Sequence, residues 1–355
     1  MMNVKPGEQP ITYQEILRQQ NGWKSALDEL YRRREFLHDL VAKHSDHFWT
    51  FTGCGTSYYL AQTASWLFKN ITGIPACAVP ASEILMYPDD VFSSGKKHLL
   101  VSLSRSGTTT EIVEATKFVR KNTPHATLAI SCSADSEMMK ASEHQISFPF
   151  QTEKSVVMTG SFSTMLLSVL CLAEMHNNRE SFFDEMIEIA DLSSQMISEN
   201  EPLIREICAE PQLENFVFLG QGPCYGIANE AALKVQEMSI LSTQSFHSLE
   251  YRHGPMSTAN CNTLVTLLLT PNSHSYEVRM IEDIQKLGAR FLVIKPNRLS
   301  SVQQAEYEVT VPKRVSPNYL PILYIPVLQL LGFYKAVSSG INPDRPKNLS
   351  AVVKL

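Results

Sequence analysis

A run of hydroxyl side chains follows an apolar segment in the N-terminal half of the chain. After 98–103 come Ser104-Arg105-Ser106-Gly-Thr-Thr109, and the residues from Glu111 onward have the apolar spacing of a helix. The first N–H groups of a helix lack internal partners and carry the positive end of its dipole, so small hydroxyls placed there can close on phosphate oxygens. No Gly-Lys-Ser/Thr or G-x-G-x-x-G pattern is present, which excludes the common nucleotide loops. The segment therefore predicts phosphate binding, with a simple helix cap as the structural alternative.

Three ionisable side chains in the C-terminal half could transfer protons. Lys234 and Glu237 are three residues apart on a predicted helix, so they share one face, and Glu230 lies four residues before the lysine. A ladder of ion pairs on a solvated face is the alternative interpretation. His253 precedes Gly-Pro in a predicted turn that could aim its imidazole, and His247 is a competing candidate.

Alternating strands and helices position the hydroxyl segment. Strands are predicted at 48–52, 76–79, 98–103, 126–130 and 146–150, and helices at 58–68, 82–85 and 111–119. Such alternation is typical of a parallel sheet covered on both faces. Ligands of these sheets bind beyond the carboxyl ends of the strands. The turns at 53–57 and 104–109 must lie there.

Further helices and one boundary are predicted around this sheet. A single helix is expected over 10–44, in which the Arg32-Arg33-Arg34 run forms a solvated face. A buried helix is expected over 156–173 and an amphipathic one over 182–198, ending near Glu201-Pro202.

The strand–turn–helix pattern then begins again. Gly53, Gly55 and Tyr58 of the first half match Gly220, Gly222 and Tyr225 of the second, all at the same offset. Glu277 falls opposite Glu111 within one residue of that offset, but the hydroxyl pattern is replaced by Pro-Asn-Ser-His. The sequence predicts an internal duplication in which only the first half binds phosphate.

Composition restricts the functional classes. The chain has 31 basic and 36 acidic residues, a net charge of −5 and no basic run, which argues against a nucleic-acid partner. Its seven cysteines are scattered and odd in number, which favours reduced thiols in a cytoplasmic protein. No secretory signal is expected, and the most apolar window, Met165 to Met175, is too short to span a membrane.

Five segments together resemble the sugar isomerase (SIS) family. They are Cys54–Ser57, Ser104–Thr109, Glu153–Phe162, Ala232–Glu237 and His253–Pro255. From about residue 30 onward the chain resembles the isomerase part of glucosamine-6-phosphate synthase and related phosphosugar isomerases, deaminases and deglycases. The resemblance implies two doubly wound α/β SIS domains. We expect a helical lead over 1–45, domains over 46–199 and 200–340, and a tail over 341–355.

The resemblance also assigns roles to individual residues. It implies that phosphate and sugar are bound by Gly55, Thr56, Ser57, Ser104, Arg105, Ser106, Thr109, Val156 and Thr159. It implies Glu237 as the base that moves a proton between C1 and C2, Lys234 beside it, and His253 as an acid that is often supplied by a neighbouring subunit. This chemistry needs a positioned base and a second proton-transfer group, and no metal or other cofactor is expected.

Four departures from the synthase pattern are visible. Arg105 replaces a glutamine and is expected to contact phosphate or to point to water. Met158 stands in place of a serine, with Thr159 as a possible substitute. The tail has Ser350-Ala351 where a lysine is expected, and Lys354 lies too late to replace it. The N-terminus begins Met-Met-Asn, so we expect no glutaminase domain and no synthesis from glutamine.

Three functions follow as hypotheses. The first is cleavage of the C–N bond of a 6-phosphorylated amino sugar or sugar–amino acid adduct, with Glu237 as base and His253 as acid. The second is aldose–ketose isomerisation of the tagatose-6-phosphate type. The third is a non-catalytic sugar-phosphate sensor, in which Glu237 and His253 would have no use. A homodimer or dimer of dimers is expected, with the apolar helix 319–334 as a contact face.

Overall fold

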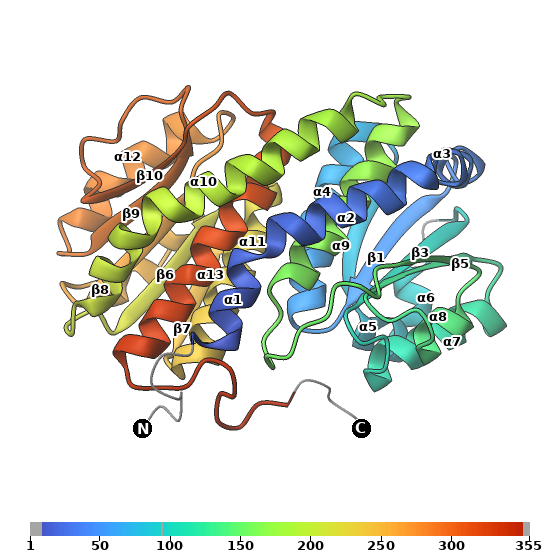
Figure 1. Ribbon diagram of the computed structural model, residues 1–355, viewed down its shortest axis with the longest axis horizontal. Helices are drawn as coiled ribbons and strands as arrows, with labels where there is room; N and C mark the ends of the chain where they lie inside the picture. Colours follow the sequence, from blue (N-terminus) through green and yellow to red (C-terminus); the bar gives the residue numbers. More distant parts are fainter. Residues whose placement is uncertain (1–8, 94, 351–355) are drawn as a thin grey trace. The chain divides into compact units, whose positions relative to one another are not determined.

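Two parallel five-stranded sheets form the core of the protein. The computed structural model describes residues 9–93 and 95–350. The first sheet has the order β2-β1-β3-β4-β5 and the second the order β7-β6-β8-β9-β10, which is the same topology (Figure 1). The strands are β1 Phe48–Gly53, β2 Ala76–Pro80, β3 His98–Ser104, β4 Ala126–Ser131, β5 His144–Ser147, β6 Asn215–Gly220, β7 Thr243–His247, β8 Thr263–Leu268, β9 Arg290–Pro296 and β10 Tyr307–Val311. The predicted α/β class and the duplicated architecture are confirmed.

Equivalent glycines make the two halves match in detail. Gly55 has φ 54° and ψ −125°, and Gly222 has φ 56° and ψ −125°. This region of backbone space is open essentially only to glycine. A Cβ on Gly53 would lie 2.5 Å from the carbonyl oxygen of Ser57, and one on Gly220 would lie 2.3 Å from that of Cys224. Both turns therefore need both of their glycines.

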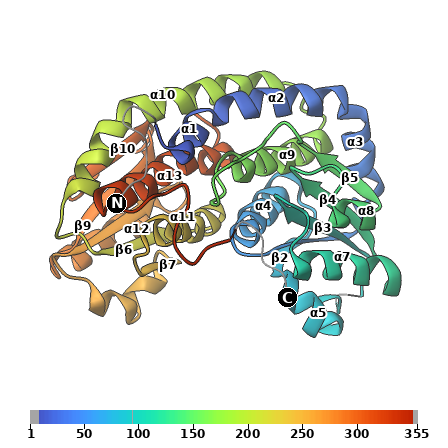
Figure 2. The same ribbon diagram turned by 60° about the horizontal axis from the view of Figure 1, so that its bottom comes forward.

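Helices cover both faces of the first sheet. They are α2 Gln19–Arg32, α3 Arg34–Lys43, α4 Thr56–Thr72, α5 Ala81–Met86, α6 Pro88–Val91, α7 Thr110–Asn122, α8 Glu137–Ala141 and α9 Gly160–His176. Helices α5, α7 and α8 pack their apolar residues against β3 and β4 on one face, and α9 lies on the other with α4 (Figure 2). Helix α9 is buried along nearly its whole length, as its apolar sequence requires.

The second sheet is also covered on two faces. Its helices are α1 Ile11–Leu17, α11 Pro223–Ser239, α12 His274–Gln285 and α13 Leu320–Ser338, with short 3₁₀ turns at Glu250–Arg252, Pro255–Thr258 and Pro317–Tyr319. Helix α12 packs on β6, β8 and β9. Helix α13 packs on α11, and Figure 1 shows α1 beside α13.

Clustering of spatial contacts divides the chain into two compact units. The first-sheet unit is formed chiefly by Arg18–Glu153 and Met158–Ala190, and the second-sheet unit by residues 9–17, Lys154–Val157 and Asp191–Leu349. Helix α10, Phe182–Ala209, contributes its first part to the former and its remainder to the latter. The domain boundaries predicted at residues 46, 200 and 341 stay a prediction. They were drawn from the sequence pattern, whereas the two units are defined by contacts in space and each combines several chain segments.

Several predicted elements differ from the structure. The expected helix over 10–44 is three helices, broken at Arg18 and at Arg33, whose ψ of 13° departs from helical geometry. The strand expected at 146–150 is β5, which ends at Ser147, and the buried helix begins at Gly160. The helix end expected before Pro202 is wrong, because α10 continues through this proline and forgoes one backbone hydrogen bond there.

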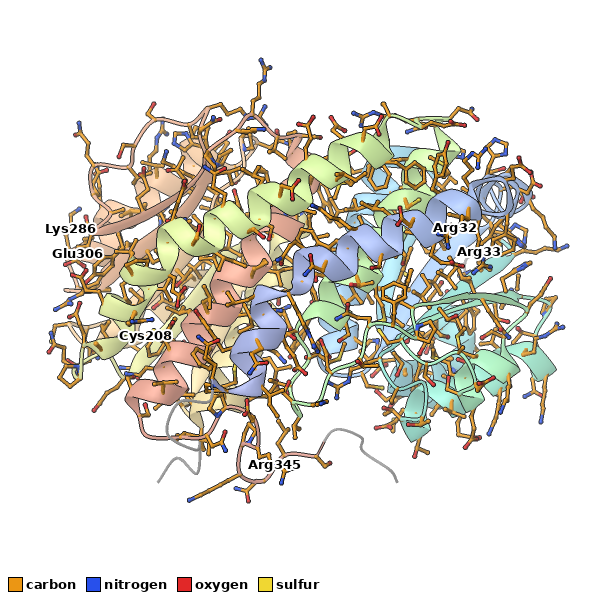
Figure 3. All side chains as sticks on the ribbon, in the orientation of Figure 1. Arg32, Arg33, Cys208, Lys286, Glu306 and Arg345 are labelled. Carbon is orange, nitrogen blue, oxygen red and sulfur yellow. The ribbon has the colours of Figure 1, made fainter. Side chains whose placement is uncertain are left out.

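The arginine run at the end of α2 is partly solvated, as predicted. The Arg32 side chain is 73% exposed, and Figure 3 shows it with Arg33 near the break between α2 and α3. The other two guanidinium groups cover aromatic rings, Arg33 over Phe36 and Arg34 over Tyr31. These contacts hold two of the three arginines against the protein surface.

The predicted contact face on the C-terminal helix is wrong. Helix α13 is the helix in the described residues whose length and mean hydropathy would allow it to cross a membrane, in a window from Pro317 to Ser338 that is 94% buried. A helix that is apolar on all sides belongs in a core. Gly332 permits this packing, since a Cβ there would lie 2.6 Å from the Met238 side chain on α11.

Candidate active site

The two small-residue turns of the first half meet at one edge of the first sheet. Strands β1 and β3 are neighbours, with Thr52 paired to Ser102, so the turns that follow Gly53 and Ser104 are adjacent. Strand order also reverses between β1 and β3, because β2 lies on one side of β1 and β4 lies beyond β3. Such a switch point is where open α/β sheets bind ligands. The predicted phosphate site is placed at this point of the sheet.

The serines of the β3 turn organise the backbone. Ser104 Oγ accepts a hydrogen bond from the Gly107 N–H at 3.0 Å, and Ser106 Oγ accepts from the Thr108 N–H at 3.3 Å and from its hydroxyl at 3.1 Å. Gly107 has φ 63°, and a Cβ there would lie 2.6 Å from the Ser136 Cβ. The tight turn therefore requires glycine and presents hydroxyls and N–H groups together.

Two helix N-termini point into the same region. Helix α4 follows Gly55 and helix α7 follows Thr109, and neither of these N-cap residues bonds its own helix through a side chain. Thr56 and Ser57 are 7% and 5% exposed in the first turn of α4. Two positive dipole ends beside buried hydroxyls form an environment that favours an anion.

The Arg105 guanidinium is paired with a buried carboxylate. Its Nη1 lies 3.1 Å from Glu153 Oε2, and the two side chains are 15% and 0% exposed. Thr159 is fully buried, and its hydroxyl donates to Glu153 Oε1 at 3.0 Å. The expected contacts of Arg105 and Thr159 with substrate stay predictions, and both side chains are engaged by Glu153 in this structure.

The segment expected to close on the sugar is held by the Glu15 carboxylate and by the Asp344 backbone carbonyl, within the second-sheet unit. The Val156 N–H donates to the Asp344 carbonyl at 3.3 Å, and the Asp344 carboxylate caps α1 through the N–H groups of Ile11 and Thr12 at 2.9 and 2.7 Å. Glu15 of α1 accepts from the Lys154 N–H at 2.6 Å and from the Ser155 hydroxyl. Helix α1 and the segment around Asp344 thus fix the backbone next to Val156.

The acid–base candidates of α11 form a buried charge cluster. Lys234 Nζ lies 3.4 Å from Glu230 Oε1 and contacts Glu237 Oε2, with side-chain exposures of 1% for Lys234, 3% for Glu230 and 16% for Glu237. Burial alone would lower the pKa of Lys234, but the two carboxylates outweigh it and the pKa is raised. The cluster is not a solvated ladder, and Glu237 is its most accessible member.

The two histidine candidates lie in the second-sheet unit after β7. His253 is exposed and follows a 3₁₀ turn, with Gly254 at φ 121° directly after it. His247 Nδ1 lies 3.0 Å from Gln221 Oε1, and its ring stacks on Tyr225 at 3.7 Å. Burial lowers the pKa of His247. His247 is thus tied to the β6 turn, and His253 is the more accessible imidazole.

Glu237 and His253 of one chain lie at opposite edges of the second sheet. Helix α11 runs antiparallel to β7, because Ser245 bonds Asn229 while Thr243 bonds the Ala232 carbonyl. Glu237 therefore lies past the amino end of β7 and His253 past its carboxyl end. The five residues of β7 separate its ends by roughly 13 Å at about 3.3 Å per residue. The structure does not bring these two candidates together within one chain.

Three residues of these networks were not among the predicted site residues. Glu15 and Asp344 accept from backbone groups far away in sequence, and Glu153 pairs with Arg105, 48 positions away. No local spacing signals such contacts. Glu153 lies at the edge of a predicted loop. Its position shortly before a helix start rich in Ser and Thr was the only local sign that its carboxylate could bond that helix N-terminus. Lys354 lies outside the described residues.

The sequence is similar to that of known proteins along most of its length. Residues 49–175 match the SIS domain model. The glutamine–fructose-6-phosphate aminotransferase (isomerizing) of Pseudomonas putida is 28% identical over 366 residues, covering 98% of this chain and 57% of that protein. The same enzyme of Wigglesworthia glossinidia brevipalpis is 26% identical over 84% of this chain and 50% of its own length. The chain therefore spans about half the length of these relatives.

Solved structures match the chain over nearly its whole length. Glucosamine-6-phosphate deaminase from Thermotoga maritima is 29% identical, with a TM-score of 0.80, over 97% of this chain and 99% of that one. Tagatose-6-phosphate ketose/aldose isomerase from Escherichia coli, at 22% identity and a TM-score of 0.85, shares the fold over 98% of both chains. The relatives and neighbours named here are enzymes. Residues 49–175 thus match an SIS domain, and the second sheet repeats the strand order of the first.

Proposed function

We propose that the protein is an enzyme that cleaves the C–N bond of a 6-phosphorylated amino sugar or fructosamine-type adduct. The observation that carries this proposal is the buried Glu230–Lys234–Glu237 cluster, which holds one partly exposed carboxylate next to a lysine. The end-to-end match with a glucosamine-6-phosphate deaminase at 29% identity supports a phosphosugar that bears nitrogen. The switch-point turns of the first sheet would bind its phosphate.

The proposed chemistry is a proton transfer followed by hydrolysis. In an opened 2-amino aldose, Glu237 takes the proton from C2 and returns it to C1, which leaves an iminium group at C2. Water adds to C2, and ammonia leaves with the ketose phosphate. For an adduct with nitrogen at C1, the same base moves the proton from C1 to C2, which leaves an iminium group at C1. Water adds to C1, and the amine leaves with the aldose phosphate. A positioned carboxylate is suited to both directions.

The second proton-transfer group is assigned to His253 of another copy of the chain. Glu237 and His253 lie at opposite edges of one sheet, so a single chain does not bring both to the same C1–C2 bond. A homodimer in which the His253 turn reaches the neighbouring site satisfies this requirement. The seven free cysteines support a reducing, cytoplasmic location.

The experiment is a substrate comparison with a matched pair of variants. Purified protein is assayed on glucosamine-6-phosphate, fructoselysine-6-phosphate and tagatose-6-phosphate, with release of ammonia or lysine and formation of the hexose phosphate measured separately. Glu237→Gln is expected to lower turnover at least about 10²-fold with phosphosugar affinity retained, whereas Glu206→Gln, on an exposed part of α10, leaves turnover unchanged.

Other outcomes identify the alternatives. Conversion of tagatose-6-phosphate with no activity on either nitrogen-bearing compound refutes C–N cleavage and establishes an isomerase. Binding of all three compounds without turnover establishes a sensor and refutes the catalytic role of Glu237.

A further inference from the structure

The side chain of Arg105 forms an ion pair with Glu153, although Arg105 lies within the hydroxyl-rich turn 104–109. The 3.1 Å ion pair joins a guanidinium that is 15% exposed to a carboxylate that is fully buried. A cation at this position would be the obvious counter-ion for a phosphate. Its charge is already balanced by a carboxylate that no solvent reaches, so the pair contributes no net charge to the turn.

Glu153 is also bound to the start of α9. Its Oε1 accepts from the N–H groups of Thr159 and Ser161 at 2.9 and 2.8 Å, and its Oε2 accepts from the Ser161 hydroxyl at 2.7 Å. With the Thr159 hydroxyl and Arg105, five donors surround one carboxylate. Charge-assisted bonds of this kind are strong, so Glu153 is a fixed anchor at a helix N-terminus.

The backbone of Arg105 is held from a second direction. Its carbonyl oxygen accepts from the Cys132 N–H and from the Ser131 hydroxyl, both at 3.2 Å; Ser131 is the last residue of β4 and Cys132 follows it. The Arg105 main chain is thereby tied to the first sheet while its side chain is tied to α9. These two contacts restrain the turn in which Ser104 and Ser106 accept hydrogen bonds from the N–H groups of Gly107 and Thr108.

We propose that Arg105 is a positioning residue and not a phosphate ligand. Through Glu153 it fixes the turn 104–109 against the start of α9, and the turn recognises its anion by hydroxyls, N–H groups and helix dipoles without a side-chain cation. The inference rests on the proposed function, because it presumes that this turn binds phosphate.

The test is a double-mutant cycle of phosphate affinity. Arg105→Gln, Glu153→Gln and the double variant are compared with the unmodified protein by calorimetric titration of glucosamine-6-phosphate and of inorganic phosphate, at low and high ionic strength. Each single variant is expected to weaken binding about tenfold, because one charge-assisted contact of the anchor is lost. The affinity of the double variant is expected to fall by much less than the product of the two single factors, because both substitutions remove the same interaction between Arg105 and Glu153.

Ionic strength separates positioning from direct binding. Loss of a positioning contact leaves the salt dependence of the dissociation constant unchanged, whereas loss of a cation at the phosphate reduces it. Arg105→Lys keeps the charge and one donor to Glu153, and is expected to restore most of the affinity. If a glutamine variant does not fold, Arg105→Lys still tests whether a cation paired with Glu153 is needed for phosphate binding.

Two results would overturn the inference. Tighter phosphate binding by Glu153→Gln would show that Glu153 competes with phosphate for Arg105. A flattened salt dependence in Arg105→Gln would show that the guanidinium contacts the anion. If the unmodified protein binds neither compound, the proposed function itself fails, and that result is distinct from both.

Discussion

Removal of the Lys234 ammonium tests the buried charge cluster of α11 directly. In Lys234→Met the side-chain volume is nearly kept, but Glu230, which is 3% exposed, loses its cation at 3.4 Å. Two charges at that distance attract by about 5 kcal/mol at an effective dielectric constant of about 20. Breaking a buried ion pair on one side costs about 3–5 kcal/mol. We expect a loss in this range from the free energy of unfolding of the second-sheet unit at pH 8.

The stability that Lys234→Met loses should increase as the pH rises. A buried carboxyl group without a partner favours its protonated form, so the folded variant holds a proton that the unfolded chain releases. Its stability therefore falls as pH rises above the ordinary glutamic acid value of about 4.3. The urea midpoint of Lys234→Met, followed by circular dichroism, should differ from that of the unmodified protein more at pH 8 than at about pH 5.

Lys335 provides the matched control. It is 6% exposed and donates to the neutral Leu213 carbonyl at 2.7 Å. Lys335→Met should cost about 1–3 kcal/mol, with little change between about pH 5 and pH 8. Equal losses in the two variants, both independent of pH, would refute the claim that Lys234 neutralises buried carboxylates.

Three further predictions follow from other parts of the structure. Gly107→Ala forces a Cβ into a φ of 63° and should cost about 1–3 kcal/mol, seen as a lower melting temperature and weaker phosphate binding. Burial, with repulsion from neighbouring histidines, lowers the pKa of His44 and of His98 to about 4. The unfolded chain takes up these protons near pH 6.5, so the urea concentration at the midpoint should decrease as the pH is lowered from about 6.5 to about 4. The decrease should be smaller in His44→Gln. Mixing Glu237→Gln chains with His253→Ala chains should restore about a quarter of the activity if each site of a dimer uses both chains, whereas no recovery would place both groups in one chain.

The duplicated fold was predictable because its signals are local. Gly53, Gly55 and their counterparts at 220 and 222 occupy turns that only glycine can form, so their spacing survives in both halves. Alternation of apolar strands and helices gave the parallel sheets for the same reason. The place of the two small-residue turns followed from strand order, since they directly follow the neighbouring strands β1 and β3. That they bind phosphate stays a prediction.

Features that depend on distant contacts were not predictable. Arg105 and Glu153 are 48 positions apart, and nothing in either neighbourhood indicates their pairing. The apolar helix α13 gave the same signal for a contact face as for a core helix, and only its packing on α11 decides between them. Pro202 indicates a helix end locally, but α10 tolerates it.

Asp344 joins parts of the chain that are synthesised far apart in time. It caps α1 near residue 11, and its carbonyl bonds the N–H of Val156. A ribosome adds residues in order, at roughly 5–20 per second. Until the ribosome has added Asp344, α1 lacks this cap and the segment at Val156 lacks this anchor, although both were synthesised much earlier.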